Sequence, residues 1–176
     1  MPYSLMGLAA LVGSFFYSEM PDWGYWLPFA ALFVLLEFFA VEVNDRMLQS
    51  SSLMVAMTAG VILAMAPDSD AMFGLALMAA LGPFTVVDFR EKRWFQPLAN
   101  FGQMVTAGAV AGFILDLFLE GVEASTNTLI LVLIVSAAAA LAYTTVQTVL
   151  VRHAVKVVFG RDNLEPWSQM PVLFTG

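Results

Sequence analysis

The run LILVLIVSAAAALA, residues 129–142, consists only of apolar and small residues. Polar and apolar residues do not alternate in it, so it does not fit the strand of a membrane β-barrel. A helix lets such a run satisfy its own backbone hydrogen bonds inside a lipid bilayer. The surrounding segment, about 128–151, reaches the ~20 residues that a membrane-spanning helix needs. The sequence therefore predicts a transmembrane helix here.

The composition of the whole chain points the same way. Of the 176 residues, 60% are hydrophobic and 12% are charged, whereas soluble domains have about a quarter charged residues. This excludes a soluble globular domain and a disordered tail. The net charge of −7 argues against a nucleic-acid binder, because phosphate binding needs clustered Lys and Arg. The chain has no Cys and one His, so neither disulfides nor a zinc–thiolate or histidine metal site is expected.

Five further apolar segments bring the number of predicted spans to six. The spans are about 4–17, 23–41, 51–66, 71–87, 97–119 and 128–151. For the first span a cleavable signal peptide is the alternative, but no basic residue precedes it. In the fourth, Gly82-Pro83 predicts a kink or the end of the regular helix. We expect an all-α, polytopic membrane helical bundle that forms a single domain over residues 1–176.

The basic residues predict the orientation. With six spans, all seven fall on one side of the membrane, and the opposite loops contain acidic residues without Lys or Arg. The positive-inside rule then places both termini in the cytoplasm of a bacterial cell, with the protein in the inner membrane. The seven residues are Arg46, Arg90, Lys92, Arg93, Arg152, Lys156 and Arg161.

Four polar residues inside the predicted spans are candidate ligand-binding residues. Glu37 and Asp116 are the ionisable ones, and each lies close enough to a span end to be solvated at the headgroups instead. Asn100 and Gln103 are three residues apart, so they share a helical face. They could recognise a small ligand or form hydrogen bonds between neighbouring helices.

Small residues predict close helix packing. Gly108 and Gly112 form a GxxxG pattern, and Ala9 with Gly13 forms a small-xxx-small pair. Such patterns let helices approach each other, within the chain, in a homodimer or with a membrane partner. Aromatic residues at the start of the second span predict an outer belt at the membrane surface. They are Trp23, Tyr25 and Trp26.

We find no catalytic constellation, phosphate-binding loop or metal motif in the sequence. We therefore expect a chain without enzymatic activity and without a cofactor.

Three stretches resemble the N-terminal multi-helix membrane regions of bacterial signalling proteins with HD-GYP or GGDEF output domains. They are FFAVEVNDRMLQSSSLMVAMTAGVILA (residues 38–64), VVDFREKRWFQPLANFGQMV (86–105) and LAYTTVQTVLVRHAVKVVFGRDNLEPW (141–167). The resemblance implies a membrane-embedded sensory or anchoring module. It carries over no catalytic residue, because the catalytic residues of such output domains have no counterpart in this sequence, which could be a truncated sensor region or a stand-alone relative.

Two alternatives stay open. Substrate-binding subunits of energy-coupling vitamin transporters are similar in architecture, with six helices and about this size. In that function Glu37, Asn100 and Gln103 would line a ligand pocket, and Ala9 and Gly13 would contact a partner subunit. The chain could also be a structural subunit of a membrane complex.

Overall fold

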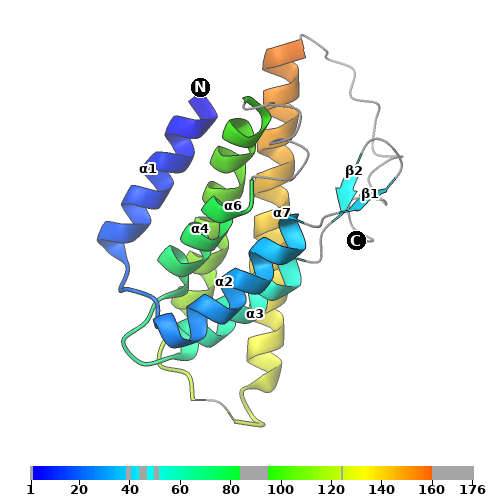
Figure 1. Ribbon diagram of the computed structural model, residues 1–176. Helices are drawn as coiled ribbons and strands as arrows, with labels where there is room; N and C mark the ends of the chain where they lie inside the picture. Colours follow the sequence, from blue (N-terminus) through cyan, green and yellow to red (C-terminus); the bar gives the residue numbers. More distant parts are fainter. Residues whose placement is uncertain are drawn as a thin grey trace.

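The computed structural model describes residues 2–38, 41–43, 47–49, 52–83, 95–123 and 125–159. These residues form an all-α bundle of six helices with one small β-hairpin (Figure 1). The helices are α1 (Pro2–Tyr17), α2 (Trp23–Phe38), α3 (Ser52–Met65), α4 (Ala71–Leu81), α6 (Phe95–Leu119) and α7 (Leu129–Phe159).

The helices correspond to the six predicted spans, with differences at their ends. The end of the regular helix predicted at Gly82-Pro83 is confirmed, because α4 ends at Leu81; residues 84–87 of the predicted span 71–87 lie outside the described residues. Proline has no backbone N–H to continue a helix and its ring clashes with the preceding turn. The predicted span 23–41 was too long, since α2 ends at Phe38 and Val41 lies in a β-strand. In contrast, α7 runs to Phe159, eight residues past the predicted end at 151.

A short antiparallel hairpin lies between α2 and α3. Strand β1 (Val41–Val43) pairs with β2 (Met47–Gln49), with Glu42 opposite Leu48. The sequence analysis expected helix up to residue 41 and no strand in this region.

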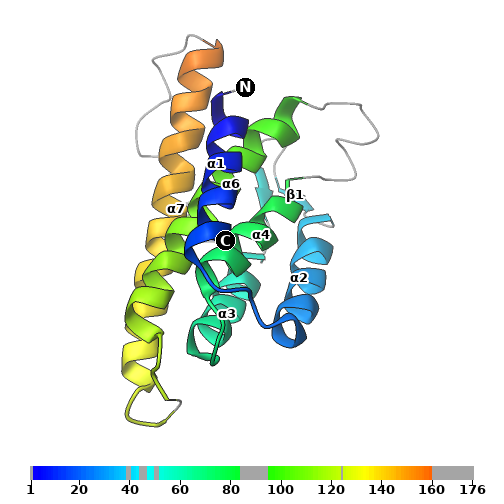
Figure 2. The same ribbon diagram turned by 90° about the vertical axis from the view of Figure 1, so that its left-hand side faces the viewer.

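Helix α6 lies at the centre of the bundle. It contacts α1, α3, α4 and α7, while α2 packs on α3 and α4. Figure 2 shows α7 along one side of the molecule and α2 on the opposite side. Most of α6 is buried within the bundle, whereas most of α7 is not.

Two helices are long and apolar enough to cross a membrane. They are Asn100–Leu119 within α6 and Leu129–His153 within α7. The other four described helices are apolar but have only 11 to 16 residues. By length and composition, the described residues thus give weak evidence for membrane association, and they do not establish a six-span topology.

Acidic residues gather at one end of the bundle, which we call the acidic end. It is formed by the end of α1, the start of α2, the α3–α4 turn, and the α6–α7 connection (Figure 1). Two hydrogen bonds join the α1–α2 connection to the α3–α4 turn: the backbone N–H of Glu19 donates to Asp70, and that of Asp22 donates to Ser69. Its acidic residues are Glu19, Asp22, Asp68, Asp70, Asp116, Glu120 and Glu123.

Candidate functional site

Glu37 faces the interior of the bundle. The α2 side chains of Trp26, Ala30 and Phe33 are buried, and their spacing of four and three residues defines the core-facing side of the helix. Glu37 follows Phe33 by four residues and therefore continues that side. Its own side chain is half-buried, so it belongs to the bundle and not to the outer surface of α2.

The carboxylate of Glu37 lies at the start of a neighbouring helix. The hydroxyl of Ser52, the first residue of α3, donates a hydrogen bond to Glu37 Oε1. Both residues make additional interactions. A carboxylate is favoured at a helix N-terminus, where the backbone N–H groups carry partial positive charge. The Glu37 charge also acts on the phenol of Tyr143, which is buried on α7, so this polar junction joins α2, α3 and α7.

A small apolar cavity lies beside this junction. Its volume is about 10 Å³, which is the size at which a single water molecule fits. Tyr143 contributes to its wall together with Phe33, Ala56, Met57, Leu75, Ala79 and Gly108. A cavity of this size does not hold an organic ligand in the conformation seen here.

Asp116 is positioned by a different contact. Its two carboxylate oxygens accept the backbone N–H groups of Ala71 and Met72, at 2.7 and 2.8 Å. These are the first two residues of α4. Asp116 on α6 thus caps the N-terminus of a helix to which it does not belong.

Asn100 and Gln103 lie near the opposite end of α6. Gln103 is buried and Asn100 is half-buried. Among the described residues neither amide forms a hydrogen bond to another helix. A helix rises about 1.5 Å per residue, which separates Asn100 from Asp116 by ~24 Å along α6. The structure therefore brings Glu37 to Ser52 and Asp116 to α4, and it does not gather the four candidates into one pocket.

The glycines of the GxxxG pattern lie where α6 meets α4. A Cβ atom on Gly108 would come within 2.9 Å of the Leu75 carbonyl oxygen, and one on Gly112 within 2.4 Å of Met72 Cα. The small pair on α1 is different. A Cβ on Gly13 would meet nothing within 4 Å, and Ala9 is exposed.

A second close helix contact was not foreseen from the sequence. Gly7 on α1 lies against Gly102 on α6, and a Cβ on Gly7 would fall 2.6 Å from Gly102 Cα. Neither glycine belongs to a GxxxG pair, so motif spacing gave no signal for this contact.

The two described basic residues lie near the end of α7. Arg152 and Lys156 both make interactions there. Between them, His153 shares a hydrogen bond with the hydroxyl of Tyr3 through its Nδ1, which places the start of α1 at this end. The other five basic residues on which the predicted orientation depends lie outside the described residues: Arg46, Arg90, Lys92, Arg93 and Arg161.

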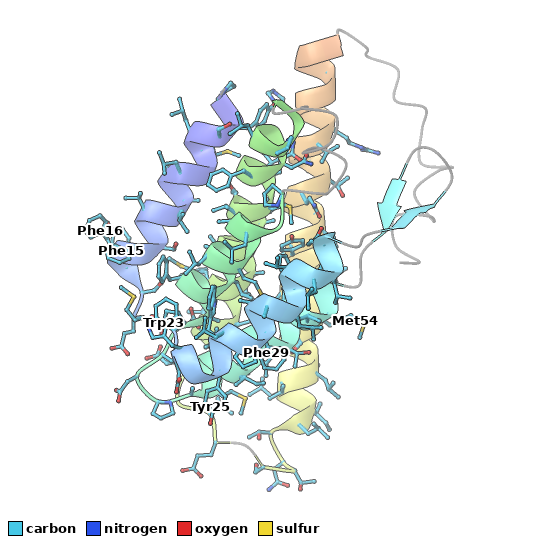
Figure 3. The ribbon with its side chains drawn as sticks, viewed as in Figure 1. Phe15, Phe16, Trp23, Tyr25, Phe29 and Met54 are labelled. Atoms are coloured by element: carbon cyan, nitrogen blue, oxygen red, sulfur yellow. The ribbon has the colours of Figure 1, made fainter. Side chains whose placement is uncertain are left out.

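The assignment of Trp26 to an outer aromatic belt was wrong. Its side chain is only 5% exposed, and its indole Nε1 donates to the Gly74 carbonyl on α4 at 2.8 Å. Trp23 and Tyr25 are exposed at the start of α2, and Phe15 and Phe16 are exposed at the end of α1 (Figure 3). Trp23 packs edge-on against Trp26, with ring centroids 5.4 Å apart.

Within the part of the chain that the structure describes, no three His, Cys, Asp or Glu side chains are grouped so that they could hold a metal ion. Comparison with known proteins gives no match to a family model, to a curated protein or to a solved structure.

Proposed function

We propose that this chain is a membrane-embedded sensory or anchoring module of a bacterial signalling system, with six spans and both termini in the cytoplasm. The observation that carries the proposal is the outer face of α7. Large apolar side chains are exposed along this helix, which is long enough to cross a bilayer. They include Leu129, Ile130, Leu133, Ile134, Leu141 and Val149. Exposed apolar surface of this extent on a single helix marks an interaction site, and lipid is the occupant that we propose.

The distribution of charge supports the orientation. The acidic end carries no Lys or Arg among the described residues, and Arg152 and Lys156 lie near the opposite end of α7. Basic residues are enriched on the cytoplasmic side of membrane proteins. The acidic end would then face away from the cytoplasm, and both α1 and α7 would have their other ends at the cytoplasmic side.

The polar residues favour a sensory or anchoring module over a transport subunit. Glu37 and Asp116 each interact with the start of a neighbouring helix, which holds the helices relative to one another. A vitamin-type transport subunit would use its inward polar residues to line a pocket. The resemblance of three stretches to sensor regions supports the same choice.

Fusions to reporter proteins test the topology and the anchoring. Green fluorescent protein placed after residue 176 should fluoresce and sediment with the membranes, and alkaline phosphatase at the same position should be inactive.

Because the chain has no Cys, single cysteines at the exposed positions Asp68 and Lys156 can be labelled without background. We expect an impermeant reagent to label the two positions from opposite sides of the membrane. Labelling of both from the same side, or a fusion that stays soluble, contradicts the proposal.

The two adjacent tryptophans test which surface meets lipid. Single-Trp variants that retain only Trp23 or only Trp26 are reconstituted into vesicles of brominated phosphatidylcholine. Bromine should quench the exposed Trp23 more strongly than the buried Trp26, although the two rings touch. If Trp23 is quenched no more than a Trp shielded from lipid, the aromatic residues at the start of α2 do not meet lipid.

A further inference from the structure

The start of α4 depends on a side chain from another helix. Asp70, the residue before α4, has extended backbone angles suited to a helix cap but makes no side-chain cap. Its carboxylate instead accepts the backbone N–H of Glu19 at 2.8 Å. The first N–H groups of α4 are accepted by Asp116 on α6. We call this arrangement, Asp116 with Ala71 and Met72, the α4 clamp.

Among the described residues, the charged side chains that act on the α4 clamp are acidic. Asp70 precedes α4 and Glu120 follows Asp116 by one helical turn, and both charges act on Asp116. Asp68 lies in the α3–α4 turn, Glu123 in the α6–α7 connection, and Glu19 and Asp22 in the α1–α2 connection. The described Lys and Arg residues are at the far end of α7. A proton bound at Asp116 would therefore relieve repulsion.

Protonation changes what Asp116 can accept. An ionised carboxylate offers two acceptor oxygens, whereas a neutral acid carries a hydrogen on one of them. The hydrogen bond that the protonated oxygen accepts from an N–H group of α4 is then weakened, because this oxygen now carries a hydrogen of its own. The favourable interaction of an anion with the helix N-terminus is lost as well. Because Gly112 packs against Met72 one turn away, the change arises where α4 and α6 are in closest contact.

We propose that the α4 clamp is a proton-operated switch, in which acidification at the acidic end loosens the start of α4 from α6. The inference rests on the proposed function for its biological meaning, since the signal of a sensory module would then be external acid. The switch itself is a property of the folded chain. It can be tested in detergent micelles independently of topology, so its failure is distinguishable from failure of the proposed function.

Selective labelling makes the clamp directly visible by nuclear magnetic resonance. The dipeptide Asp-Ala occurs once in the sequence, at 70–71. Carbonyl-¹³C aspartate with ¹⁵N-alanine therefore selects the amide of Ala71 alone. Ala-Met occurs at 56–57, 64–65 and 71–72, so the corresponding labelling reports Met72 together with two control amides. Met57 and Met65 are not bonded to a carboxylate in the structure.

In the parent chain we expect the Ala71 and Met72 amide protons to shift together with a single midpoint as the pH is lowered, while the control amides stay in place. Asp116→Asn, which resembles the neutral acid, should abolish this dependence. Glu120→Gln removes a repelling charge without touching either hydrogen bond, so it should move the midpoint to lower pH. The proposal is overturned if the two amides do not respond to pH, or if they respond equally in Asp116→Asn.

Discussion

Gly102 on α6 lies against the carbonyl oxygen of Tyr3 on α1, so closely that a Cβ atom at position 102 would come within 1.9 Å of that oxygen. The obstacle is backbone, which cannot rotate away as the tip of a side chain can. With Gly7 on the facing helix, this contact brings α1 and α6 together backbone to backbone. It lies at the same end as the hydrogen bond between Tyr3 and His153.

Gly102→Ala should therefore push α1 away from α6. Overpacking typically costs about 1–3 kcal/mol, and we expect a loss in the upper part of this range, measured by thermal unfolding in detergent. Gly13→Ala is the matched control, because a Cβ there would meet nothing within 4 Å. Alanine is the better helix former by about 1 kcal/mol, so this variant should keep or gain stability. Equal losses in both variants would contradict the contact.

The two neighbouring tryptophans should differ in their contribution to stability. Trp26→Phe removes the indole N–H that donates to the Gly74 carbonyl; losing such a hydrogen bond costs about 0.5–1.5 kcal/mol, and the smaller buried ring adds a cavity cost. Trp23→Phe changes an exposed ring, and such surface substitutions usually stay within about 0.5 kcal/mol. Chemical denaturation in mild detergent measures both. A larger effect at position 23 than at 26 would be incompatible with the structure.

A double-mutant cycle tests the junction of α2 and α3. Glu37→Leu and Ser52→Ala each remove one partner of the same hydrogen bond. Their effects on the free energy of unfolding should deviate from additivity by about 0.5–3 kcal/mol. Thr58→Ala serves as the control, because the Thr58 hydroxyl bonds to Met54 within α3. It should combine additively with Glu37→Leu, and additivity in both cycles would show that Glu37 and Ser52 are not coupled.

Asp116→Ala should destabilise the folded chain near neutral pH. It leaves two N–H groups of α4 without their acceptor, and each such loss costs about 1–3 kcal/mol. Glu120→Ala removes an exposed acidic side chain from the same helix and should have little effect. Thermal unfolding of both variants at one pH separates the role of the cap from that of general charge. If Glu120→Ala is the more destabilised variant, the cap is not what holds α4.

The positions of the helices could be predicted from the sequence because the chain marks them with turn residues. Ala66-Pro67-Asp68 ends α3, and Gly82-Pro83 ends α4. Gly121, with a φ of 70°, follows α6. At these points glycine, proline or aspartate provides backbone angles that a helix interior does not use. The apolar runs between them do not alternate as barrel strands do, which leaves the helix as the form that satisfies their backbone in an apolar environment.

The inward face of each helix could not be predicted in the same way. The core of the bundle and the outer surface of α7 are both apolar, so hydropathy alone does not separate them. This is why Trp26 was assigned to the outer belt and why the contact of Gly7 with Gly102 was missed. For α2 a usable signal exists, since Trp26, Ala30, Phe33 and Glu37 follow one another at helical spacing. That spacing places Glu37 with the core residues.

The candidate polar residues were recognised individually, but their partners were not. Ser52 and Tyr143 belong to no recognisable motif. The partners of Asp116 are the backbone N–H groups of Ala71 and Met72, and because nearly every residue has such a group, the sequence does not indicate which ones are used. These contacts join residues that are far apart in the chain: Glu37 and Ser52 are separated by 15 positions, and Asp116 and Ala71 by 45. They depend on how the helices pack, which the sequence of a single helix does not contain.

The unequal burial of α6 and α7 sets different limits on how the two helices can change by mutation. Along α6 a methyl group added at position 102, 108 or 112 meets the backbone of a neighbouring helix, so these positions should accept glycine alone. On the outer face of α7 the large apolar side chains are exposed, so exchange of one of them for another alters few contacts within the described chain. A library of random variants should therefore accumulate substitutions on α7 while α6 stays nearly constant, and the two helices should drift at different rates over time.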